Sequence, residues 1–116
     1  MNPGDTFLIP DAIGTHLNCV LKIFPDGGLV LCHLTSLQGR SDKTCVIQPG
    51  EHSFVTKPTI VRYDQCQHLC TEEGLKALER LIWKRFEPLS AELLARIIQG
   101  ALNSPQTPDK IKALLK

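Results

Sequence analysis

The sequence has few aromatic residues and no long apolar run. Aromatic side chains make up 5% of the 116 residues and apolar residues 42%, so the core must be mainly aliphatic. No apolar run reaches the roughly 20 residues that a membrane-spanning helix needs. The start of the chain, residues 1–5, carries no positive charge leading into an apolar segment, as a secretory signal would. These features predict one soluble domain in the cytoplasm, with no membrane partner.

The chain also lacks an excess of charge of one sign. Its formal net charge is +1. This excludes the broad basic surface that drives nucleic-acid binding, so any contact with RNA must be local.

The number of cysteines is odd, which argues against a disulfide framework in a chain without a secretion signal. Cys19 and Cys45 fit small, buried core residues. Cys66, His68 and Cys70 offer ligand atoms, but their spacing matches no standard zinc pair and no fourth ligand is evident. We therefore expect no metal and no cofactor.

The clearest pattern in the chain is a β-hairpin. Period-two alternation predicts strands over 16–24 and 28–36, on either side of the turn signal Pro25-Asp26-Gly27-Gly28. The first strand has an apolar face of Leu17, Cys19, Leu21 and Ile23. His33 alternates with Leu29 and Leu31 in the second strand, so we expect a packed side chain there.

This hairpin would bring three polar side chains to one rim. His16 begins the first strand, and Thr35 and Ser36 end the second. In a regular antiparallel pair these ends meet, so an imidazole and two hydroxyls would lie close together. The structural alternatives are a histidine that faces water and hydroxyls that cap a turn.

Apolar periodicity and turn residues predict the other elements. Further strands are expected over 5–9, 44–48 and 59–64, with the first ending at Pro10. Helices are expected over 72–86, 91–100 and 108–115, with N-caps at Thr71, Ser90 and Thr107. The predicted fold class is α+β. A small antiparallel β-barrel over residues 1–70 is followed by a helical C-terminal extension over residues 71–116, in a single domain.

Four stretches, in this order along the chain, carry a resemblance. They are Gly4–Ile9, His16–Phe24, Val30–Ser36 and Lys57–Gln65. Together they resemble the MazF/PemK family of toxins from bacterial toxin–antitoxin systems, over about residues 4–85. The resemblance implies an SH3-like barrel with a C-terminal helix, and commonly a homodimer. It also implies metal-independent cleavage of single-stranded RNA, in which the 2′-hydroxyl attacks the adjacent phosphate, and a partner antitoxin protein.

The family's usual catalytic groups are an arginine at the start of the second strand and a Thr or Ser after the third. Thr35 and Ser36 match the second group, whereas Thr15-His16 stands where the arginine is expected. His16 is our first candidate for proton transfer, because imidazole titrates near neutral pH.

Four further residues complete the candidate site. His52 lies in an irregular segment, where functional residues are common, and is the second proton-transfer candidate. Lys57 or Arg62 would supply the cation that replaces the absent arginine. Tyr63, like Trp83, is a candidate for stacking on a base, with core packing as its structural alternative. The competing function is a non-catalytic barrel that binds a protein or nucleic-acid partner. The apolar stripes of the helices fit either packing within the chain or a dimer surface.

Overall fold

The computed structural model describes residues 2–11, 14–70, 72, 76 and 84–116. The elements are β1 (Thr6–Asp11), β2 (Gly14–Ile23), β3 (Leu29–Ser36), β4 (Val46–Ile47), β5 (Thr59–Val61), the 3₁₀ turn η1 (Tyr63–Gln65), β6 (Gln67–Leu69), β7 (Lys84–Phe86), α2 (Ala91–Asn103) and α3 (Asp109–Leu115). In this part of the chain the strands form a seven-stranded antiparallel sheet in the order β4-β5-β3-β2-β1-β7, with β6 also paired to β3. The α+β class is confirmed, although five strands were expected.

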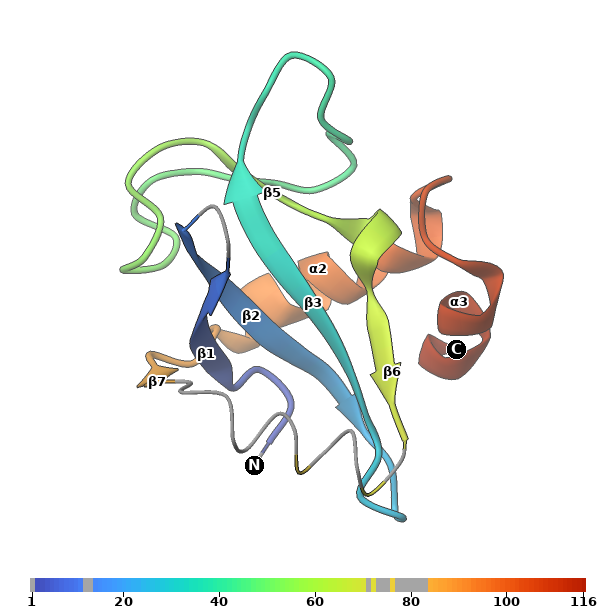
Figure 1. The fold of residues 1–116 in the computed structure, drawn as a ribbon. Coiled ribbons are helices and arrows are strands. Elements are labelled where there is room, and N and C mark those ends of the chain that lie inside the picture. Colours follow the sequence, from blue (N-terminus) through green and yellow to red (C-terminus); the bar gives the residue numbers. More distant parts are fainter. Residues whose placement is uncertain (1, 12–13, 71, 73–75, 77–83) are drawn as a thin grey trace.

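One long strand, β3, organises this sheet. Its residues 29–33 pair with β2 on one edge. On the other edge its end pairs with β5 and its start with β6, because η1 turns the chain along that edge (Figure 1). The strand predicted over 59–64 therefore ends at Val61, and β6 is an element that we did not expect.

The predicted hairpin between β2 and β3 is confirmed. Gly27 adopts φ 89°, which a glycine accepts without strain, and its amide donates to the Phe24 carbonyl at 2.9 Å. The register shifts between Val20 and Lys22, so Leu21 is an extra residue. This bulge moves Ile23 to the face opposite Leu21, so the predicted apolar face is wrong at that one position.

The strand β1 continues through Pro10 to Asp11, beyond its predicted end. Pro10 lies opposite Thr15 of β2, whereas β7 pairs only with Thr6, Phe7 and Leu8. The missing N–H of a proline is tolerated where a neighbouring strand does not need it.

Two of the three predicted helices are confirmed. Ser90 accepts a hydrogen bond from the Leu93 amide and is the N-cap of α2, as expected, and α2 runs on to Asn103. The N-cap of α3 is Pro108 rather than Thr107, whose buried hydroxyl has no hydrogen-bond partner among the described residues. No helix in the described part of the chain is long and apolar enough to cross a membrane.

The helix predicted over 72–86 falls mainly outside the described residues. Glu72 and Lys76 are helical and form an ion pair at 2.9 Å. Residues 84–86 form β7 instead, so the predicted helix is wrong at its end.

The two faces of the sheet are both apolar, and α2 and α3 cover one of them (Figure 1). That face supplies Leu17, Cys19, Val30, Cys32 and Leu34, and the helices supply Leu93, Ile97, Ala101 and Ile111. The apolar stripes of these helices therefore pack within the chain. The opposite face carries a smaller cluster of Phe7, Val20, Leu29 and Leu31.

Two long-range contacts fasten α2 and α3 to the sheet. The bulge turns Lys22 toward the helices, where its ammonium donates to the Leu114 carbonyl at 2.8 Å. The hydroxyl of the buried Tyr63 donates to the Ile97 carbonyl at 2.8 Å, at the place where Gly100 lets the helix approach.

A methyl group at Gly100 would overlap the Tyr63 hydroxyl. We expect Gly100→Ala to lower the free energy of unfolding by about 1–3 kcal/mol through overpacking. That loss exceeds the helix propensity of alanine, which is worth up to about 1 kcal/mol. Urea denaturation measures the change, and Gly39→Ala, which meets no atom within 4 Å, is the control. A Gly100→Ala protein as stable as the wild type would contradict this packing.

Candidate functional site

An open pocket lies at the rim where β2 begins and β3 ends. Its volume is about 330 Å³. The residues that line it are His16, Leu34, Thr35, Ser36, Phe54, Thr56, Lys57 and Thr59. This first pocket thus brings together four of the predicted site residues, namely His16, Thr35, Ser36 and Lys57.

The strand register explains this convergence. Asn18 pairs with His33, and beyond that pair His16 and Thr35 both reach the lining of the pocket. On the other edge of β3, Ser36 pairs with Thr59, which brings Lys57 to the same rim. The side chain of Thr59 donates to the Lys57 carbonyl at 2.9 Å and fixes the entry to β5.

The charge of the first pocket suits an anion. Lys57 is exposed, and His16 can carry a positive charge when it is protonated. Among the described residues, none that lines this pocket has a carboxylate. The hydroxyls of Thr35 and Ser36 add hydrogen-bond donors. A phosphate group is the kind of ligand that this lining favours.

A second imidazole lies next to His16. The ring centroids of His16 and His33 are 5.3 Å apart and the planes are tilted by 59°. His33 is half-buried, and its carbonyl accepts a hydrogen bond from the Arg62 amide at 2.9 Å. His33 thus lies between the ring of His16 and the backbone of Arg62.

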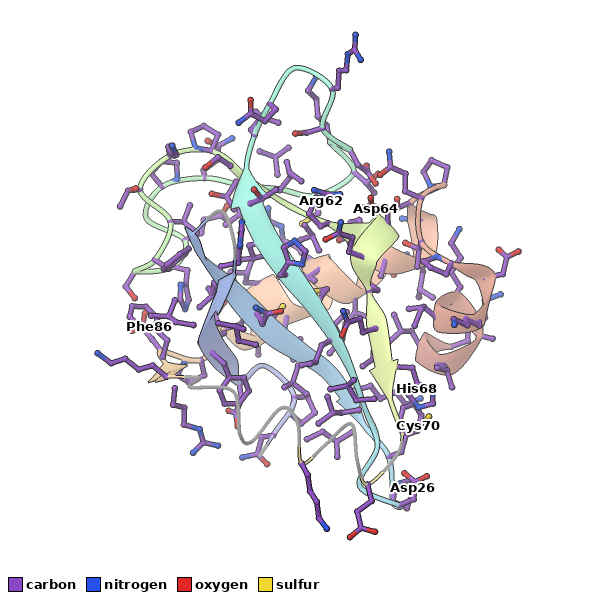
Figure 2. All side chains as sticks on the ribbon, viewed as in Figure 1. Asp26, Arg62, Asp64, His68, Cys70 and Phe86 are labelled. Carbon is purple, nitrogen blue, oxygen red and sulfur yellow. The ribbon has the colours of Figure 1, made fainter. Side chains whose placement is uncertain are left out.

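Arg62 forms a fork with Asp64. Its Nε and one terminal nitrogen each donate to a different carboxylate oxygen at 2.9 Å, and the two side chains lie together beside η1 (Figure 2). This bond lowers the pKa of Asp64 and raises that of Arg62, so both groups stay charged. The fork gives the guanidinium a fixed orientation.

The Arg62–Asp64 fork lines a second pocket, of about 360 Å³. The residues around it are Thr35, Gln38, Arg40, Ser41, Asp42, Ile60, Val61, Arg62, Asp64 and Gln106. Thr35 lines both pockets, so the two are neighbours with one shared wall.

His33 and Asp64 were not among the predicted site residues. His33 was interpreted as a packed residue, and Asp64 was not considered. For His33 the signal was strand alternation, since it lies two positions before Thr35 in β3. Asp64 lies in η1, beyond the end of β5, so strand alternation gave no signal for it.

The structure places His52 outside the first pocket. It is 6% exposed, its Nδ1 accepts from the Phe54 amide at 3.1 Å, and its Nε2 lies 2.7 Å from the Glu87 carbonyl oxygen. A nitrogen that accepts an N–H bond carries no proton, so the other nitrogen is the donor to Glu87. His52 therefore joins the segment after β7 to Phe54, which lines the first pocket.

Tyr63 also lies away from both pockets. Its side chain is fully buried, and this burial raises the pKa of its hydroxyl far above the ordinary value. It packs against α2 rather than presenting a face to a ligand. Trp83 lies outside the described residues.

The candidate metal ligands do not converge. Among the described residues there is no group of three His, Cys, Asp or Glu side chains that could hold a metal ion. Cys66 is buried, Cys70 is exposed, and the His68 ring contacts Phe24. None of the five cysteines forms a disulfide, and Cys19 and Cys45 are buried as expected.

A clamp holds the loop between β3 and β4 against the C-terminal extension. The Ser104 hydroxyl donates to Asp42, whose other oxygen accepts from the Thr44 amide at 2.9 Å. Burial raises the pKa of Asp42, but the hydrogen bonds from Ser104 and Thr44 outweigh it, so the pKa lies below its ordinary value.

In comparisons with known proteins, no family model and no curated protein matches this chain.

We expect Asp42→Asn to lower the free energy of unfolding at neutral pH by about 1 kcal/mol, the worth of one hydrogen bond. A carboxyl with a lower pKa in the folded state stabilises the fold above its unfolded pKa of about 3.9. That contribution disappears as the pH falls through the folded pKa. Urea titrations of both proteins at several pH values should therefore converge in strong acid. A difference that grows as the pH falls would contradict the clamp.

Proposed function

We propose that this protein is an endoribonuclease of the MazF/PemK type, which cleaves single-stranded RNA without a metal and is neutralised by a partner antitoxin. The observation that supports it is the first pocket, where His16, Thr35, Ser36 and Lys57 surround a space free of carboxylates among the described residues. The curved sheet that carries this rim fits the SH3-like barrel that the sequence resemblance implies.

The proposed reaction is an attack by the RNA on itself. The 2′-oxygen forms a bond to the adjacent phosphorus while the bond from phosphorus to the 5′-oxygen breaks. The products are a 2′,3′-cyclic phosphate and a 5′-hydroxyl. One group must take the proton of the 2′-hydroxyl, and the leaving oxygen must gain a proton.

We assign the base to His16, which lines the pocket beside Thr35. The open pocket admits water, which can supply the proton to the leaving oxygen. His33 is a positioning residue, since its ring lies against that of His16. His52 is given no proton transfer, because both of its ring nitrogens lie on backbone groups. Its role is to position Phe54.

The charge that develops on the phosphorane needs fixed donors. The hydroxyls of Thr35 and Ser36 are placed to supply two. Arg62 lines the second pocket, which adjoins the first at Thr35, and is our candidate for the cation that replaces the family arginine, because Asp64 holds its guanidinium in place. Lys57 is exposed, so its charge attracts the substrate from solution without the same fixed orientation.

His16→Ala should lower the rate of RNA cleavage by about 10²–10⁴-fold, the usual loss for a positioned proton-transfer group. It should also abolish growth inhibition on expression, while circular dichroism shows an intact fold. His68→Ala is the matched control, since His68 lies on β6 at the other end of β3. Added chelator should change neither activity.

Wild-type protein that neither slows growth nor cuts RNA, with or without chelator, would refute the enzyme. The alternative of a non-catalytic binding module would then remain. Equal activity of the wild type and His16→Ala would support RNA cleavage by this protein but contradict the assignment of His16 as the base.

Arg62→Ala should lower kcat by about 10²–10³-fold, as the loss of one fixed donor to a developing oxyanion does. Arg62→Lys should not restore it, because an ammonium cannot keep the two-bond fork with Asp64. Lys57→Ala should mainly raise KM and weaken the dependence of KM on salt. Steady-state kinetics on a short RNA at two salt concentrations separates these effects. A larger loss of kcat for Lys57→Ala than for Arg62→Ala would reverse the assignment.

A further inference from the structure

The second pocket differs from the first in its charge. Its lining holds two arginines and two aspartates, so the positive and negative charges balance. A phosphate would meet carboxylates there, whereas a neutral group with both donors and acceptors would not be repelled. The volume of about 360 Å³ lies within the range of sites for small organic molecules.

Besides Arg62 and Asp64, this pocket contains side chains that can bind a neutral group through hydrogen bonds. The loop between β3 and β4 supplies Gln38, Arg40 and Ser41, and the connection between α2 and α3 supplies Gln106. Amides donate and accept hydrogen bonds, and a guanidinium plane stacks on bases. The buried strand residues Ile60 and Val61 lie beneath these polar groups.

Hydrogen bonds join the two segments that form this wall of the second pocket, namely the loop between β3 and β4 and the connection between α2 and α3. Ser104 is fully buried, donates to Asp42 and accepts from the Gln106 amide at 3.1 Å. Within the loop, the Ser41 hydroxyl accepts from the Gln38 amide at 2.8 Å. The wall is therefore preorganised, which lowers the cost of ordering it around a ligand.

Because Thr35 lines both pockets, a ligand in the second pocket would lie next to a phosphate bound in the first. A phosphate bound at the first pocket and at Thr35 has its next nucleotide within reach of the second. We propose that the second pocket binds the nucleobase next to the cleaved phosphate, and that Gln106 and Arg40 help to determine which base is accepted. The inference rests on the proposed RNA cleavage, and it gives the C-terminal extension a part in substrate selection.

The binding of bases can be tested without cleavage. The four 5′-ribonucleoside monophosphates, and inorganic phosphate as a separate probe, are titrated into the whole ¹⁵N-labelled protein and followed by NMR. At least one nucleotide should shift the amides of Gln38, Ser41 and Gln106, and phosphate alone should not. Gln106→Ala should weaken this binding by about two- to tenfold, the worth of one hydrogen bond. Gln99→Ala, an exposed glutamine of α2, is the matched control.

The cleavage arm uses a long single-stranded RNA of mixed sequence, with the new 5′ ends mapped by sequencing. Gln106→Ala should change the base preference at one position beside the cut, while Gln99→Ala should leave it unchanged. Arg40→Ala, in an exposed loop, is the second variant if Gln106→Ala proves unstable.

The inference is overturned if none of the four nucleotides shifts the amides of the second pocket. That result is expected if the second pocket binds a protein instead of a base. It is also overturned if phosphate alone reproduces the shifts. RNA cleavage with an unchanged base preference in both variants would reject the inference and keep the nuclease. Nucleotide binding at this pocket in a protein that cuts no RNA would reject the nuclease, and with it a base bound next to a cleaved phosphate, and would leave only a nucleotide-binding pocket.

Discussion

The antiparallel register between β2 and β3 is the constraint on which both the core and the proposed site depend. The pair Asn18–His33 sets one face of the hairpin, and Cys19–Cys32 sets the other. A slip of one residue would exchange the two faces, burying His33 and exposing Cys32. The same register that puts two thiols in the core therefore puts two imidazoles at the surface.

The two pockets divide the recognition of a nucleotide between them. The first is bounded by hydroxyls and by cations, which suit a phosphate, and the second has balanced charges and amide side chains, which suit a base. Thr35 lines both pockets, and the Arg62–Asp64 fork lines the second. This division needs little net charge, which agrees with a chain that carries only +1.

Alternation and turn residues predicted the hairpin, the Ser90 cap of α2 and the meeting of His16 with Thr35, because these depend on neighbours in sequence. The bulge at Leu21, strand β6 and strand β7 depend on partners far along the chain, so local patterns missed them. The second pocket was missed for the same reason, since its walls come from residues near 40, 62 and 106. His52 could be placed only when the Glu87 carbonyl was known.

The bond from Lys22 to the Leu114 carbonyl joins residues 92 positions apart. One face of the sheet is covered by α2 and α3, which are translated after every strand of that sheet. During synthesis, Leu17, Val30 and Leu34 therefore stay in contact with water until residues 91–115 have left the ribosome. Until the helices emerge, the nascent chain exposes these apolar side chains, a state in which binding by a chaperone would prevent aggregation.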